Sequence, residues 1–141
     1  MIKWGIVGAG NIAHSFSKDL ALVNGGKLVS VASRNLEKAQ AFADEYGALN
    51  AYGSYEELFN SKTVDVIYLA TPHTSHANLS IAAMKAGNAV LCEKPMGVNK
   101  GEVEKMVAVA KENNVFLMEA LWTRFNPTIK KVKELVDNGT I

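Results

Sequence analysis

The stretch IKWGIVGAGNIAHSF, residues 2–16, determines how the rest of the chain is interpreted. A short apolar strand is followed at once by small residues and by a helix. Gly8, Gly10 and Ala13 match the G-x-G-x-x-A pattern of a dinucleotide-binding turn: the first glycine permits the tight turn, the second admits a pyrophosphate, and the alanine lets the helix pack on the sheet. The helix N-terminus then offers unpaired N–H groups to phosphates. The alternative is a strand–helix turn without a ligand.

Strands and helices alternate along the remaining sequence, with short connections. Several strands are apolar throughout rather than at every second residue, which is typical of a parallel sheet covered on both faces. We therefore predict an α/β fold, a doubly wound and mostly parallel Rossmann sheet in a three-layer αβα arrangement. The predicted strands are 2–7, 28–32, 48–51, 64–70, 88–92 and 115–118, and the predicted helices are 11–23, 36–46, a short one from 55, 75–86, 100–113 and 126–137.

Composition restricts the class of protein. The chain has 141 residues, of which 48% are hydrophobic and 21% charged, and its net charge is +1; a soluble globular domain has this composition, and a nucleic-acid partner is not expected. No apolar run approaches the ~20 residues of a membrane span, and no signal peptide is evident. The single cysteine, Cys92, forms no internal disulfide, and no metal site is expected. We expect a cytoplasmic protein.

The end of the second strand bears on which dinucleotide binds. NAD-binding versions of this fold carry Asp or Glu there, which accepts hydrogen bonds from the ribose 2′-hydroxyl. This chain has Ser33 and Arg34 instead, with Lys38 one helical turn later. A guanidinium holds a 2′-phosphate through charge-assisted hydrogen bonds. The sequence therefore favours NADP(H) over NAD(H), the alternative being that Arg34 only faces solvent.

Two further polar stretches follow predicted strands, at the edge where open α/β sheets bind ligands. Thr71-Pro72-His73 with His76 is the first, and Glu93-Lys94-Pro95 is the second. A lysine placed there can donate a proton to a developing alkoxide. The alternatives are a surface Glu-Lys pair and histidines that only cap a helix.

The segments GAGNIA, VASRNLEKAQAFA and IYLATPHTSHANLSIAAMKAGNAVLCEKP together resemble the N-terminal domain of the glucose–fructose oxidoreductase/inositol dehydrogenase (Gfo/Idh/MocA) family. The resemblance covers essentially the whole chain. Within that family, FLMEALWTRFNP most resembles the branch of dimeric dihydrodiol dehydrogenase and NADP-linked D-xylose dehydrogenase. Many members carry Asn at the position of His73.

The resemblance implies a role for each matching position. Lys94 would be catalytic, reaching substrate and cofactor together, and Glu93 would contact the nicotinamide ribose. Trp122 and Arg124 would close over the cofactor. The full set implied to bind cofactor is Gly8, Gly10, Asn11, Ile12, Ser33, Arg34, Lys38, Thr71, Pro72, His73, His76, Glu93, Lys94, Trp122 and Arg124.

The family resemblance also predicts domain organisation. Residues 1–125 would form the nucleotide-binding domain, and residues 126–141 a helix leading into a substrate and dimerisation domain that this chain does not contain. The expected function is hydride transfer between NADP(H) and a sugar or diol, in a protein that is a homo-oligomer at full length. The alternative is a non-catalytic NADP(H) sensor or regulatory module. A methyltransferase ranks below both, because its adenosine site prefers an acidic residue where Ser33 and Arg34 stand.

Overall fold

Six parallel strands form one sheet in the order β3-β2-β1-β4-β5-β6 in the computed structural model, which describes residues 1–141. The order reverses between β1 and β4, as in a doubly wound fold, so the predicted fold class is confirmed. The strands are β1 (Ile2–Val7), β2 (Gly26–Ala32), β3 (Asn50–Tyr52), β4 (Val66–Leu69), β5 (Ala89–Glu93) and β6 (Leu117–Ala120).

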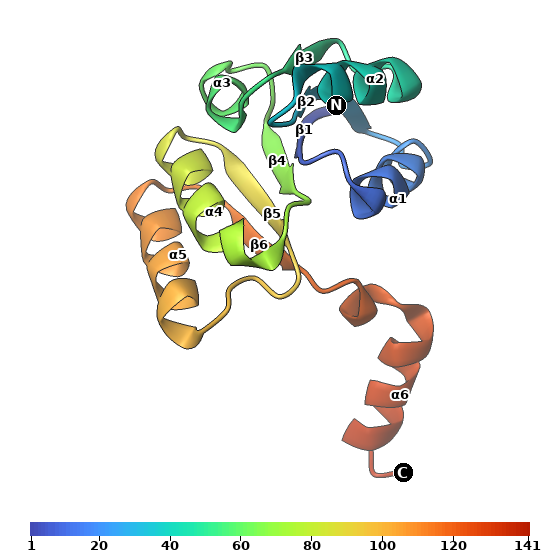
Figure 1. Cartoon of the computed structure of the whole chain (residues 1–141). Coiled ribbons are helices and arrows are strands. Elements are labelled where there is room, and N and C mark those ends of the chain that lie inside the picture. Colours follow the sequence, from blue (N-terminus) through green and yellow to red (C-terminus); the bar gives the residue numbers. More distant parts are fainter.

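Helices cover both faces of the sheet (Figure 1). One apolar core lies under α1 and α2, and the other lies under α3, α4 and α5. Because the inner strands are buried on both faces, their sequences are apolar at consecutive positions. The helices are α1 (Asn11–Leu20), α2 (Leu36–Tyr46), α3 (Tyr55–Asn60), α4 (His76–Lys85), α5 (Lys100–Glu112) and α6 (Pro127–Asp137), with 3-10 turns η1 (His73–Ser75) and η2 (Trp122–Phe125).

Helix ends follow the capping residues in the sequence. The side chains of Asn35, Ser54 and Asn99 each accept a hydrogen bond from a backbone N–H in the first turn of the helix they precede. Gly47 ends α2 in the left-handed conformation, at φ 70°. These local signals explain why the helices begin where the sequence predicts.

Some boundaries differ from prediction for identifiable reasons. The helix predicted to reach Val23 ends at Leu20, because residues 21–23 continue as turns before Gly25, whose φ is +97°. Strand β2 begins at Gly26, since the ladder with β1 extends to Ile2. The helix predicted from residue 75 is preceded by η1 and begins at His76.

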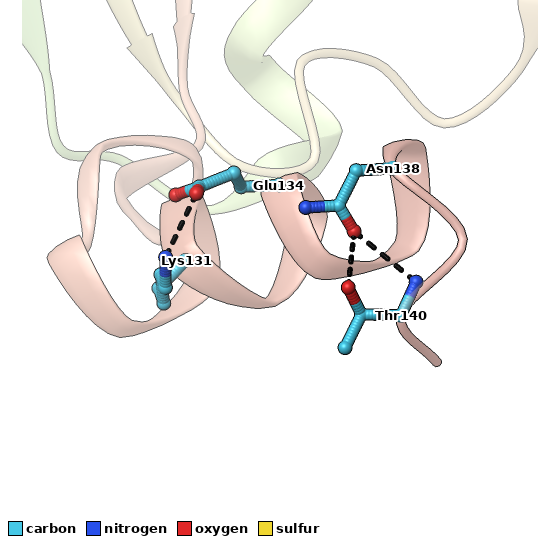
Figure 2. A network of polar contacts seen from close by, with 4 residues as sticks. All are labelled: Lys131, Glu134, Asn138 and Thr140. Atoms are coloured by element: carbon cyan, nitrogen blue, oxygen red, sulfur yellow. Dashed lines mark hydrogen bonds and ion pairs between the residues drawn. The ribbon is translucent and has the colours of Figure 1, made fainter.

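Helix α6 extends away from the sheet (Figure 1). Its polar side chains are joined mainly to one another: Figure 2 shows Lys131 donating to Glu134, and Asn138 accepting from the backbone and hydroxyl of Thr140. The apolar residues Ile129 and Val132 remain exposed. None of the helices combines the length and apolar character needed to cross a membrane.

Candidate cofactor and active site

The carboxyl ends of the strands gather the predicted site residues. Since all six strands are parallel, the segments that follow them leave the sheet at one edge. Gly8 follows β1, Ser33 follows β2, Thr71 lies just past β4, Lys94 follows β5, and Trp122 lies just past β6. Residues separated by more than a hundred positions therefore share one edge, which is where ligands bind in this architecture.

The glycine turn is close-packed at one glycine and open at the other. Gly8 has a φ of +97°, and a Cβ there would lie 2.9 Å from the carbonyl oxygen of Ala70. Its N–H donates to the carbonyl of Ala32 at 2.9 Å, so the turn is tied to both neighbouring strands. Gly10 is the N-cap of α1 without any side-chain cap, and a Cβ there would meet nothing within 4 Å. Open space therefore lies beside unpaired N–H groups, as a pyrophosphate site requires.

Two cationic side chains, Arg34 and Lys38, follow the carboxyl end of β2. Arg34 and Lys38 are exposed at the start of α2, and neither forms an ion pair within the chain. Ser33 is held in place, because its N–H donates to the carbonyl of Tyr52 at 3.1 Å and its Oγ accepts from the N–H of Asn35. The loop is thus ordered by backbone contacts, and the charged side chains are free for an anionic ligand.

Glu93, at the end of β5, has a buried carboxylate with two donors. The Tyr68 hydroxyl donates to Oε1 at 2.6 Å, and the N–H of Lys94 donates to Oε2 at 3.2 Å. Burial, followed by this hydrogen bond, raises the pKa of the Tyr68 phenol well above its usual range, so Tyr68 remains a donor. Phe16 stacks on Tyr68 with ring centroids 3.9 Å apart. The Lys94 side chain is exposed, while its backbone N–H is held by the Glu93 carboxylate.

His76 connects the two turns that the sequence singled out. The residue is only 1% exposed, and its Nδ1 and Nε2 each lie 2.8 Å from a carbonyl oxygen, of Pro95 and Thr71 respectively. His73, Pro72 and Thr74 are exposed in the same turn. The two histidines therefore differ in environment: the His73 side chain is exposed to solvent, and the His76 side chain is buried.

An apolar cavity of about 270 Å³ lies between α1 and η2, beside Glu93. It brings together Ile12 and Trp122, two of the residues predicted to contact cofactor. Trp122 is 63% exposed, and Arg124 is exposed in the same 3-10 turn. The other apolar side chains of its wall include Phe16, Leu91, Met118 and Phe125.

The sequence did not reveal two residues of this region. Tyr68 belongs to an apolar strand, and nothing in the sequence distinguishes it from a core aromatic. Glu119 lies in β6, and its Oε1 accepts from the N–H of Met96 at 2.8 Å, 23 positions away. Both contacts depend on the pairing of β4, β5 and β6, which local patterns do not specify.

The buried thiol of Cys92 gives stability a defined pH dependence. Burial raises the pKa of Cys92 from 9.0 to about 11. Above pH 9.0 the unfolded chain loses the thiol proton while the folded chain keeps it, so stability falls as the pH rises.

Between about pH 9 and 11 we expect the Cys92 thiol to lower the free energy of unfolding by about 1.4 kcal/mol per pH unit. Urea denaturation of the wild type and of Cys92→Ala across that range measures the slope. The variant should lose this contribution and keep the one from Tyr68 at higher pH. Parallel slopes for the two proteins would contradict the prediction.

Comparison with known proteins places this geometry among oxidoreductases. The model of a family described as an oxidoreductase family with an NAD-binding Rossmann fold matches residues 2–121. The trans-1,2-dihydrobenzene-1,2-diol dehydrogenases of mouse and human are 46% and 42% identical over 99% of this chain. The chain spans 43% and 42% of the lengths of those two relatives.

Solved structures share the whole fold. KijD10, a 3-ketoreductase from Actinomadura kijaniata crystallised with NADP, superimposes with a TM-score of 0.92 at 29% identity, over 99% of this chain and 45% of its own. Myo-inositol 2-dehydrogenase from Lactobacillus plantarum does so with a TM-score of 0.89 at 28% identity, over 99% of this chain and 42% of its own.

Proposed function

Because this chain belongs to the Gfo/Idh/MocA oxidoreductase family, we propose that it is the NADP(H)-binding part of an oxidoreductase that acts on a sugar or diol. The observation that carries this proposal is the Glu93-Lys94 pair, fixed at the same sheet edge as an open phosphate turn. The family includes dihydrodiol dehydrogenases at more than 40% identity. The predictions of a homo-oligomer and of a cytoplasmic location stay predictions.

The residues present fit a 2′-phosphorylated dinucleotide. The N-terminus of α1 beside Gly10 would hold the pyrophosphate, with Asn11 and Ile12 along it, and Ser33, Arg34 and Lys38 would hold the 2′-phosphate. Thr71, Pro72 and His73 would line the path toward the nicotinamide, which Trp122 and Arg124 would cover. When bound, the cofactor supplies or accepts the hydride.

The role proposed for the protein is to position groups and to move one proton. Lys94 would place its side-chain nitrogen at the substrate oxygen: the ammonium would donate a proton when a carbonyl is reduced, and the neutral amine would take one up when an alcohol is oxidised. The Glu93 carboxylate, which accepts from the Tyr68 hydroxyl, also accepts from the N–H of Lys94 and so holds the backbone of Lys94 in place.

Two glycine substitutions separate the fold from the binding site. Gly8→Ala should lower the free energy of unfolding by about 1–3 kcal/mol, because alanine at positive φ is strained and its Cβ meets the Ala70 carbonyl. Gly10→Ala should lower the free energy of unfolding by no more than about 1 kcal/mol, since its Cβ enters open space and alanine is only a weaker N-cap than glycine. It should nevertheless weaken NADPH binding by at least about tenfold, because a methyl group would occupy the pyrophosphate position.

Thermal unfolding and NADPH fluorescence titration of both variants make the comparison. Gly10→Ala is the decisive one, since it tests binding in a protein that folds normally. Wild-type NADPH affinity in that variant would place the dinucleotide elsewhere.

A further inference from the structure

His76 faces hydrogen-bond acceptors on both sides of its ring. Nδ1 lies 2.8 Å from the Pro95 carbonyl oxygen, and Nε2 lies 2.8 Å from the Thr71 carbonyl oxygen. Backbone carbonyls only accept hydrogen bonds, and a neutral imidazole carries a single N–H. A neutral ring would therefore direct one lone pair at an oxygen 2.8 Å away, in a site that is 1% exposed. Both contacts are attractive only when both ring nitrogens carry protons.

The same peptide group that accepts from His76 also donates to a carboxylate. The Pro95 carbonyl receives the Nδ1 contact, and the N–H on the other side of that peptide bond, of Met96, donates to Glu119 Oε1 at 2.8 Å. The order is therefore ring N–H, carbonyl, amide N–H and carboxylate. Such a chain polarises the peptide between a cation and an anion, which strengthens both hydrogen bonds.

We propose that His76 is a buried imidazolium paired with the Glu119 carboxylate through the Pro95–Met96 peptide group. This clamp holds the turn after β4 against the turn that carries Lys94, so His76 is a positioning residue for Lys94. His76 thus reaches the cofactor only through the two turns it holds. Its importance for catalysis rests on the proposed function, whereas its protonation state does not.

A buried imidazolium at His76 needs a compensating negative charge, and Glu119 is the group that supplies it. Burial of a charge is costly unless the charge is paired and hydrogen-bonded. Glu119 is the carboxylate that reaches His76 through a single peptide group. Other titratable groups on the elements around α4 are neutral, hydrogen-bonded elsewhere or exposed. Cys92 keeps its proton, the Glu93 carboxylate accepts from Tyr68, and the Glu102 carboxylate accepts from the N–H of Val98. The exposed ones are His73, Lys94, Glu56 and Glu57.

The ring can be observed directly, because the chain has only three histidines. In protein labelled with ¹⁵N-histidine, we expect both His76 nitrogens to give protonated-type resonances at neutral pH, with two slowly exchanging ring protons. Exposed His73 serves as the internal reference for a ring in contact with solvent. A pyridine-type nitrogen on His76 at neutral pH would overturn the proposal.

A matched pair of variants tests the partner. Glu119→Gln keeps the size of the side chain and an oxygen that can accept from Met96, but it removes the charge. We expect a pyridine-type signal to appear on His76 in this variant, and exchange of the Lys94 amide to accelerate at least about tenfold as the clamp loosens. Glu102→Gln removes a carboxylate that also accepts a backbone N–H in the same loop, from Val98. It should leave both readouts as in the wild type.

Each result decides the question. A doubly protonated ring in Glu119→Gln would refute the pairing, and an equal response in Glu102→Gln would reduce it to a general charge effect. Neither measurement needs cofactor or substrate. The result for the His76–Glu119 pair is therefore independent of whether the chain binds NADP(H).

Discussion

Lys94→Met should lower turnover by about 10²–10⁴-fold, the usual contribution of a positioned proton donor, while NADPH affinity changes by no more than about twofold. Methionine keeps most of the apolar length of lysine and removes the ammonium. The backbone should not move, because the N–H of residue 94 still donates to Glu93 and the Pro95 carbonyl still faces His76.

The matched control is Lys100→Met, which alters another exposed lysine, at the start of α5, where it pairs only with exposed Glu104. That variant should turn over like the wild type. Steady-state rates from NADPH absorbance and binding from NADPH fluorescence give the two quantities separately. If Lys94→Met turns over normally, the lysine is not the proton donor, and a binding-only module becomes the better description.

Arg34→Asp should reverse the choice of cofactor. Loss of a charge-assisted hydrogen bond costs about 1.5–3 kcal/mol, and the new carboxylate repels the 2′-phosphate, so NADPH affinity should fall by about 100-fold or more. The same carboxylate can accept hydrogen bonds from a free ribose 2′-hydroxyl, and NADH affinity should therefore rise. Stability should change little, because Arg34 is exposed and forms no ion pair.

Arg34→Ala separates the two causes, since it removes the attraction without adding repulsion. It should weaken NADPH binding less than Arg34→Asp and leave NADH binding unchanged. Lys18→Asp, in the last turn of α1, makes the same charge change away from the carboxyl edge. Titration of each variant with both cofactors provides the test, and an unaltered NADPH-to-NADH ratio in Arg34→Asp would show that Arg34 only faces water.

Features that depend on near neighbours could be predicted from the sequence. The caps at Asn35, Ser54 and Asn99 are bonds within a single helical turn, so the residue type and its spacing suffice. The glycine turn is equally local, and its place after β1 fixes its place in the sheet. For the same reason the alternation of strands and helices was enough to predict a parallel sheet.

Features that depend on strand register could not be predicted. The sequence placed the last strand at 115–118, but β6 runs Leu117–Ala120, because its ladder with β5 pairs Leu117 with Val90. That register brings Glu119 to the loop after β5, where it meets Met96. The contacts of Tyr68 with Glu93 and of His76 with Pro95 span 25 and 19 positions, and each requires strands and turns to be placed in space first.

The central position of β1 has a consequence for the order in which the chain assembles during synthesis. Strand β1 pairs with β2 on one side and with β4 on the other, and the second pairing joins Trp4 to Val66. When the ribosome has released the chain only as far as the end of β3 at Tyr52, β1, β2 and β3 can already associate under α1 and α2, but the other edge of β1 is still bare. An unpaired strand edge is a template for wrong partners. We therefore expect nascent chains that stall before β4 emerges to be strong ligands for chaperones, and release of β4 to end that interaction.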